Sequence, residues 1–91
     1  MRIVGDIPHK HYKITVFEMN HRLSLQIEDG DLQQQYRFAD GVADHYSDVV
    51  AMVTDLYLMR VDNVFQHMKA AKREAVKVLT QDLEDDFPEI I

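Results

Sequence analysis

The feature that most constrains the fold is the stretch from Tyr46 to Leu79, in which apolar residues recur at a regular spacing. This stretch contains neither proline nor glycine. Its apolar residues recur every three or four positions, at Tyr46, Val50, Val53, Tyr57, Val61, Val64, Met68, Ala71, Ala75 and Leu79. Because this spacing keeps one side of an α-helix apolar, the sequence predicts one long C-terminal helix over about residues 45–83.

Three short segments that precede this helix have the residue types and the period of β-strands. They cover about residues 11–19, 22–28 and 31–38, and they are separated by the turn-forming pairs Asn20-His21 and Asp29-Gly30. If both turns have two residues, the strands pair so that one face of the sheet is apolar. This face contains Tyr12, Ile14, Val16, Leu23, Leu25, Ile27, Leu32, Tyr36 and Phe38. We therefore predict an α+β fold, in which a three-stranded antiparallel meander packs this face against the long helix.

The same two turns predict which residues face each other across the strands. The first hairpin should pair Ile14 with Ile27, and the second should pair Ile27 with Leu32. The opposite face is mostly polar, with Phe17 and Met19 as its large apolar residues. These two side chains are either singly exposed, which is common, or form a small contact patch for a partner or for the N-terminal segment.

The chain of 91 residues is expected to form a single small domain, residues 1–91. We expect an extended N-terminal segment over residues 1–10, in which Arg2-Ile3-Val4 could form a short strand. The last residues, 84–91, are acidic and include Pro88. Acidic side chains oppose the dipole at a helix C-terminus and proline cannot continue a helix, so we expect a frayed tail there.

Composition restricts the classes of function that are open to the chain. The absence of cysteine excludes disulfides, thiolate metal sites and cysteine nucleophiles. A formal net charge of −6 argues against a general affinity for nucleic acid or anionic lipid. The most apolar segment, residues 49–61, contains Asp55 and Arg60 and is too short to span a bilayer. We therefore expect a cytoplasmic protein that does not enter a membrane.

The predicted helix is too long for the predicted sheet to cover. A helix over residues 46–79 extends about 50 Å, whereas strands of seven or eight residues are only about 25 Å long. In addition, ten of the thirteen residues in the segment 49–61 are apolar, and a helix that is apolar nearly all round is buried nearly all round. Both features predict that part of this helix needs another surface to cover it.

The simplest such surface is a second copy of the chain, and we predict a homodimer formed through the long helix. The residues expected at this interface are Met52, Leu58, Met59, Val64, Met68, Ala71, Ala75 and Leu79. Another protein partner is a further possibility. A monomeric alternative has the helix break at Asp62-Asn63 and fold back on itself, since Asn63 could cap a second helix. No glycine or proline is present there to form the turn.

No pattern in the sequence indicates an active site, so we expect a non-catalytic protein without a cofactor. The two serines are not placed beside a general base, and the three glycines are scattered rather than gathered in a phosphate-binding loop. His9 and His11 could point the same way in an extended chain and share a metal ion. No third ligand accompanies them in the sequence, and surface histidines without a metal are the simpler interpretation.

An alternative function is that of a nucleic-acid-binding regulator. Its contacts would come from the polar face of the sheet or from the basic residues Lys69, Lys72, Arg73 and Lys77. Three-stranded sheets followed by a helix occur in DNA-reading domains, but that similarity is one of fold alone. The polar face carries glutamines with only Lys13 and Arg37 as bases, in an acidic chain, so the protein-interaction hypothesis is favoured.

Overall fold

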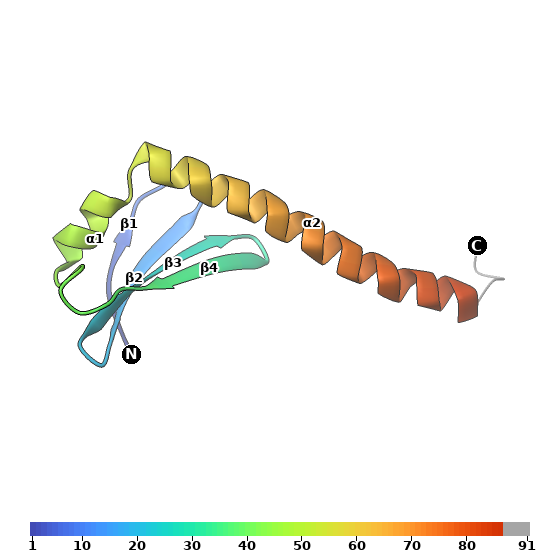
Figure 1. The fold of residues 1–91 in the computed structure, drawn as a ribbon, viewed down its shortest axis with the longest axis horizontal. Coiled ribbons are helices and arrows are strands. Elements are labelled where there is room, and N and C mark those ends of the chain that lie inside the picture. The colour runs from blue at the N-terminus through green and yellow to red at the C-terminus, as the bar shows by residue number, and fades with distance from the viewer. Residues whose placement is uncertain (87–91) are drawn as a thin grey trace.

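The computed structural model describes the backbone of residues 1–86 and the side chains of residues 1–80. Its elements are, in order, β1 (Arg2–Ile7), β2 (Lys13–Met19), β3 (Arg22–Asp29), β4 (Leu32–Arg37), α1 (Tyr46–Met52) and α2 (Asp55–Asp86). The strands form one antiparallel sheet in the order β1-β2-β3-β4, and α2 crosses the sheet and continues well beyond it (Figure 1). The predicted α+β class and long C-terminal helix are confirmed.

The sheet has four strands rather than the predicted three, and the additional strand, β1, includes Arg2-Ile3-Val4, which the sequence left open as a short strand. β1 pairs antiparallel with β2, and its register shifts between Ile3 and Gly5 at a bulge. A Cβ atom at Gly5 would lie only 2.7 Å from the ring of Tyr46, so the absence of a side chain lets α1 approach the sheet. The Tyr46 hydroxyl also donates a 2.9 Å hydrogen bond to the carbonyl oxygen of Asp6. β1 thus provides part of the surface on which α1 rests.

The first hairpin has the predicted turn and the predicted pairing. Asn20 and His21 both have positive φ angles, 53° and 64°, as a type I′ turn requires. Ile14 pairs with Ile27 across the two central strands, β2 and β3. Asparagine tolerates this backbone region better than most residues, which explains why the chain turns here.

The second hairpin turns one residue later than predicted. Its loop is Gly30-Asp31, and Ile27 therefore pairs with Gln34 rather than with Leu32. Gly30 has a φ angle of 60° and takes the first central position, which suits glycine in a type II′ turn. The pairing is displaced by two residues, and since side chains alternate with a period of two, the same residues still face the core.

The apolar face predicted from the strands is the core of the protein. From the sheet, the core contains Tyr12, Ile14, Val16, Leu23, Leu25 and Ile27, all buried, while Leu32, Tyr36 and Phe38 are partly buried against it. The helical side contributes Val49 of α1 and Val61 and Phe65 of α2. The outer face keeps its polar character, although Thr15 and Ser24 are buried there because they are small residues on the two central strands.

The predicted single helix over residues 45–83 is divided in two. Val53 has a non-helical backbone, with φ −85° and ψ 77°, and separates α1 from α2. Thr54 then caps α2, since its Oγ1 accepts a 3.1 Å hydrogen bond from the N–H of Tyr57. The break predicted as an alternative at Asp62-Asn63 is also wrong, because α2 continues through both residues.

At its C-terminal end α2 continues to Asp86, three residues beyond the predicted end at residue 83. The remainder of the predicted acidic tail, residues 87–91, lies outside the described part of the chain. The molecule measures 58 × 28 × 20 Å, and its long dimension follows α2 (Figure 1). Within residues 1–86, no helix is both long enough and apolar enough to cross a membrane.

Candidate interaction site

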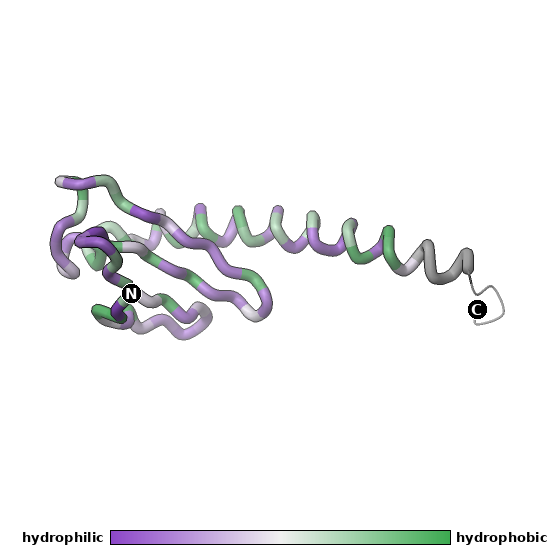
Figure 2. Tube along the Cα trace, turned by 90° about the horizontal axis from the view of Figure 1, so that it is seen from below, coloured by the Kyte–Doolittle hydropathy of each residue, from purple (hydrophilic) through white to green (hydrophobic). Residues whose placement is uncertain are grey.

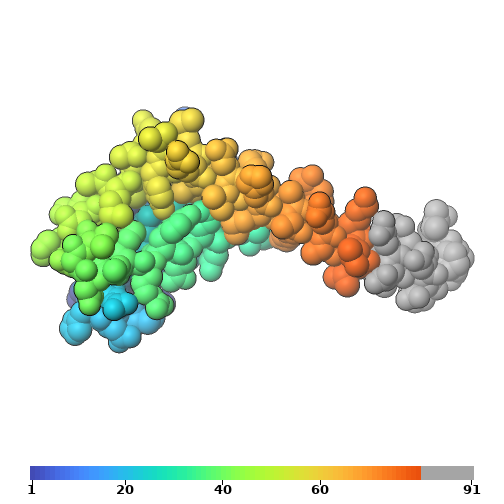
Figure 3. Space-filling model, in the orientation of Figure 1, coloured from blue at the N-terminus to red at the C-terminus, as the bar shows by residue number. Residues whose placement is uncertain are grey.

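The most distinctive surface of the molecule is the half of α2 that projects from the sheet. We call residues 70–86 the arm. Every side chain of the arm that the structure describes, from residue 70 to residue 80, is exposed to solvent. Met68 is the last residue of α2 that packs partly against the core. Figure 3 shows residues 70–80 of the arm extending away from the body formed by the sheet, α1 and the first half of α2.

The arm continues the apolar side of α2 without anything of its own chain to cover it. Val76 is 48% exposed and Leu79 is 65% exposed. Ala71 and Ala75 lie at helical spacing from these residues and are also exposed. Apolar and polar residues keep alternating along the helix as it leaves the body (Figure 2). Small side chains such as alanine allow a second helix to approach closely, so this surface suits helix packing.

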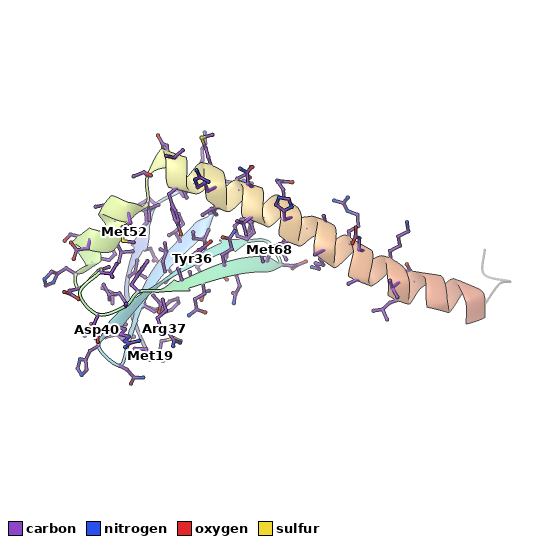
Figure 4. The ribbon with its side chains drawn as sticks, viewed as in Figure 1. Met19, Tyr36, Arg37, Asp40, Met52 and Met68 are labelled. Atoms are coloured by element: carbon purple, nitrogen blue, oxygen red, sulfur yellow. The ribbon has the colours of Figure 1, made fainter. Side chains whose placement is uncertain are left out.

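The predicted interface residues lie in different parts of the structure. Met68, Ala71, Ala75 and Leu79 follow one another along α2, and Met59 and Val64 are exposed on the same helix. Leu58 is partly buried against the core, so only part of its side chain is accessible. Met52 belongs to α1, and Figure 4 shows it well separated from Met68. Because the helix breaks at Val53, the predicted set does not form one continuous stripe.

Some exposed apolar residues were not assigned to the interface by the sequence. Leu56 is 64% exposed near the start of α2, and Val76 and Val78 are exposed on the arm. Leu56 belongs to the segment that is apolar nearly all round, which is the signal that could have identified it. Val76 lies beside Leu79 at a spacing of three, so it could have been added to the stripe from the sequence alone.

Two of the four basic residues form ion pairs beside the turn between β3 and β4. The Lys69 ammonium lies 3.1 Å from an Asp29 carboxylate oxygen, and the Lys72 ammonium lies 3.3 Å from one of Asp31. A groove opens between this turn and α2, and its lining residues are Asp29, Gly30, Asp31, Leu32, Lys69, Lys72, Arg73 and Val76. Two of the four bases proposed to contact nucleic acid are thus partly neutralised by acids of the same chain.

His9 and His11 have structural roles in the loop that leads into β2. The Nδ1 atom of His9 accepts hydrogen bonds from the N–H groups of His11 and Tyr12, each 3.0 Å long. Both imidazole rings also pack against the Tyr12 ring, with centroid distances of 5.1 and 4.8 Å. Within the described residues, no group of three or more histidine or acidic side chains is arranged to hold a metal ion.

Polar side chains that the sequence did not single out fasten α2 to the sheet. The Gln34 side chain is buried and donates a 3.0 Å hydrogen bond to the carbonyl oxygen of Val61, while its own amide oxygen accepts a hydrogen bond from the Tyr36 hydroxyl. Figure 4 shows Tyr36 in the layer between the sheet and α2. Burial, followed by its proximity to Tyr36, raises the pKa of the Tyr57 hydroxyl.

A second fastening joins the start of β2 to α2. The Tyr12 hydroxyl donates a 3.0 Å hydrogen bond to Oδ1 of Asp62. Burial of the ring raises the pKa of Tyr12 to about 12, and the hydrogen bond and negative charge of Asp62 act in the same direction. All these contacts lie on the part of α2 that covers the sheet. They hold the helix in place and leave the arm to project.

Comparison with known proteins does not identify a relative for this chain. No family model, no curated protein and no solved structure matches it. The function therefore has to be inferred from the chain's own surfaces. Among the described residues, the surface that its own fold leaves most exposed is the arm.

Proposed function

We propose that this protein is a small, non-catalytic interaction protein that forms a homodimer through α2. The observation that carries the proposal is the arm, a helical segment whose described side chains are all exposed. Helices in water owe most of their stability to packing, and short isolated ones are marginal. The arm remains helical to Asp86 although its described side chains are all exposed and its ion pair with the body, Lys72–Asp31, lies near its start. We therefore infer that a surface from outside the chain covers it.

A second copy of the chain fits the apolar part of the arm. Burying an exposed residue such as Val76 or Leu79 contributes about 1.5–3 kcal/mol. A two-fold dimer places the same patch of both chains in one interface, so each apolar residue of the patch is buried in both copies. Ala71 and Ala75 would let the two helices approach closely. The arm thus offers a self-complementary surface, and no other protein has to be assumed.

The proposal includes a location in the cytoplasm and action without a cofactor, both as expected from the sequence. The nucleic-acid alternative is not favoured by a specific contact. Lys69 and Lys72 pair with Asp29 and Asp31, so two of the four bases are partly neutralised within the chain. Compared with the nucleic-acid alternative, protein interaction through the arm explains a larger part of the exposed surface of the molecule.

Sedimentation equilibrium of the wild-type chain and two variants tests this proposal. Leu79→Glu places a charge in the apolar part of the arm and should yield a monomer, because an interface would have to bury that charge. Thr80→Glu adds the same charge to the neighbouring exposed residue and should remain a dimer. Met59→Glu tests the other apolar surface of α2 and should also remain a dimer if the arm is the interface.

A helical far-ultraviolet circular dichroism spectrum for each variant would show that the fold is retained. A wild-type chain that sediments as a monomer at every concentration would contradict the proposal. A dimer that Met59→Glu dissociates and Leu79→Glu leaves intact would move the interface to the start of α2.

A further inference from the structure

The arm and the residues just before it carry opposite charges at their two ends. Four bases and one acid lie within residues 69–77, whereas residues 82–86 contain four acids and no base. Both segments belong to the unbroken helix α2, and their centres are separated by roughly 16 Å at about 1.5 Å per residue. Two parallel arms in register would place bases beside bases and acids beside acids. Two antiparallel arms would place each basic segment beside the acidic end of the other.

The apolar spacing of the arm is compatible with the same antiparallel arrangement. Lys72, Val76 and Leu79 follow one another on one side of α2, and positions 83 and 86 continue this spacing in the sequence. If Leu79 packs on Leu79 of the second copy, Ala75 lies opposite position 83 and Lys72 lies opposite position 86. One register therefore matches an apolar centre and places a base opposite an acid at each end.

The groove beside α2 lies where the end of the second arm would arrive. It is formed by α2 and by the turn between β3 and β4, and the apolar side chains of Leu32 and Val76 contribute to its lining. Asp29 and Asp31 are matched there by Lys69 and Lys72. Arg73 also lines the groove and has no ion pair among the described residues, so the groove has an excess of positive charge.

We infer that this groove receives the acidic end of α2 from a second copy of the chain, in an antiparallel pair of arms centred near Leu79. The inference rests on the proposed homodimer and specifies the direction and register of its two helices. The apolar centre provides the attraction, and the charges at the two ends select antiparallel over parallel pairing, because like charges placed together are destabilising.

Disulfide cross-linking tests the direction of the two arms. The natural chain contains no cysteine, so each introduced thiol is unique. Ala75→Cys and Leu83→Cys are prepared separately and oxidised either alone or as a mixture. In the antiparallel register, position 75 faces position 83, so the mixture should form a disulfide-linked heterodimer. Each variant alone should stay largely unlinked, because identical positions are then about 12 Å apart, which is too far for a disulfide.

The masses of the same variants under reducing conditions separate the two claims. If they are monomers, the proposed homodimer fails and the inference fails with it. If they are dimers but Ala75→Cys links to itself, or no link forms in the mixture, the homodimer stands and the antiparallel register is overturned. A dimer that cross-links only in the mixture supports both.

Charge reversal provides an independent readout of the same pairing. Lys72→Glu with Arg73→Glu, and separately Asp85→Lys with Asp86→Lys, should each weaken dimerisation by about tenfold, since attraction becomes repulsion at both ends. Mixing the two variants should restore the wild-type affinity as a heterodimer, because each base again meets an acid. As a control, Lys10→Glu changes an exposed charge on the body and should leave the affinity unchanged. Wild-type affinity in both reversed variants would overturn the inference.

Discussion

The two halves of α2 follow one apolar spacing but have opposite surroundings. In the half that crosses the sheet, Val61 is 1% exposed and Phe65 is completely buried, whereas Val76 and Leu79 on the arm are 48% and 65% exposed. The period of a helix therefore determines which of its sides is apolar and does not determine what covers that side. The chain itself covers the first half, and we propose that a second copy covers the arm.

The side chains of the two halves differ in size in a way that suits these partners. Tyr57 and Phe65 fill the space between a helix and a sheet, and the Phe65 ring packs at a tilt against Tyr12 with ring centroids 5.5 Å apart. The arm instead has Ala71 and Ala75 beside its larger apolar residues. Bulky residues suit a sheet about 10 Å away, and small residues suit a neighbouring helix at a shorter distance.

The largest expected effect comes from removing the main anchor of the covered half. Phe65→Ala should lower the free energy of unfolding by about 3–5 kcal/mol, because it leaves a cavity in the core. Leu79→Ala on the arm should change the unfolding of a dilute, monomeric sample by less than about 0.5 kcal/mol. Urea unfolding of both variants measures the contrast. Equal losses would mean that the arm also packs on its own body.

A smaller effect is expected from the tyrosines beneath the covered half at high pH. The fold raises the pKa of Tyr12 to about 12, so between pH 10 and 12 the folded chain keeps a proton that the unfolded chain releases. The contribution of the protonated Tyr12 hydroxyl to the free energy of unfolding is fully present below about pH 10. Most of it should be lost by about pH 12, a change on the order of 2 kcal/mol. Tyr57, whose pKa is also raised, contributes in the same direction.

Unfolding free energies measured across this pH range would show the decrease. Tyr12→Phe should flatten the curve between pH 10 and 12, because the group that titrates is then missing. An unchanged slope in that variant would mean that the Tyr12 hydroxyl is not protected by the fold.

A comparable or smaller loss of unfolding free energy is expected when the hydrogen bonds of Gln34 that hold α2 on the sheet are removed. Gln34→Ala removes the hydrogen bond to Val61 and the acceptor of the Tyr36 hydroxyl, and should cost about 1–3 kcal/mol. The neighbouring Gln33 and Gln35 are exposed on the other face of β4, so alanine at either position is a matched control that should have little effect. Similar costs at all three positions would show that Gln34 does not hold the helix.

The central hairpins were predictable because their signals are local. Alternating residues and the turn at Asn20-His21 correctly predicted the pairing of β2 with β3. In the second hairpin, the preference of Gly30 for the first position of its turn displaced the pairing by two residues, which leaves the faces unchanged. The signals for β1 were weaker, because it is short, contains a glycine and is joined to β2 by residues without a tight turn.

The helix break and the site were harder to predict for physical reasons. Thr54 is a good cap residue, but glycine and proline are the stronger sequence signs of a helix break, and neither is present there. The exposed arm was predictable in outline, since helix and strand lengths follow directly from residue counts. The groove beside Arg73 was not, because it depends on where the turn between β3 and β4 meets α2.

The most direct measurement of the central claim is the mass of the unmodified chain in solution. Light scattering behind a sizing column, over a series of concentrations, would compare it with the 10.7 kDa of one chain. A self-associating arm predicts twice that mass at micromolar concentrations and a shift toward one chain on dilution. A mass of 10.7 kDa at every concentration would contradict the claim that a second copy covers the arm.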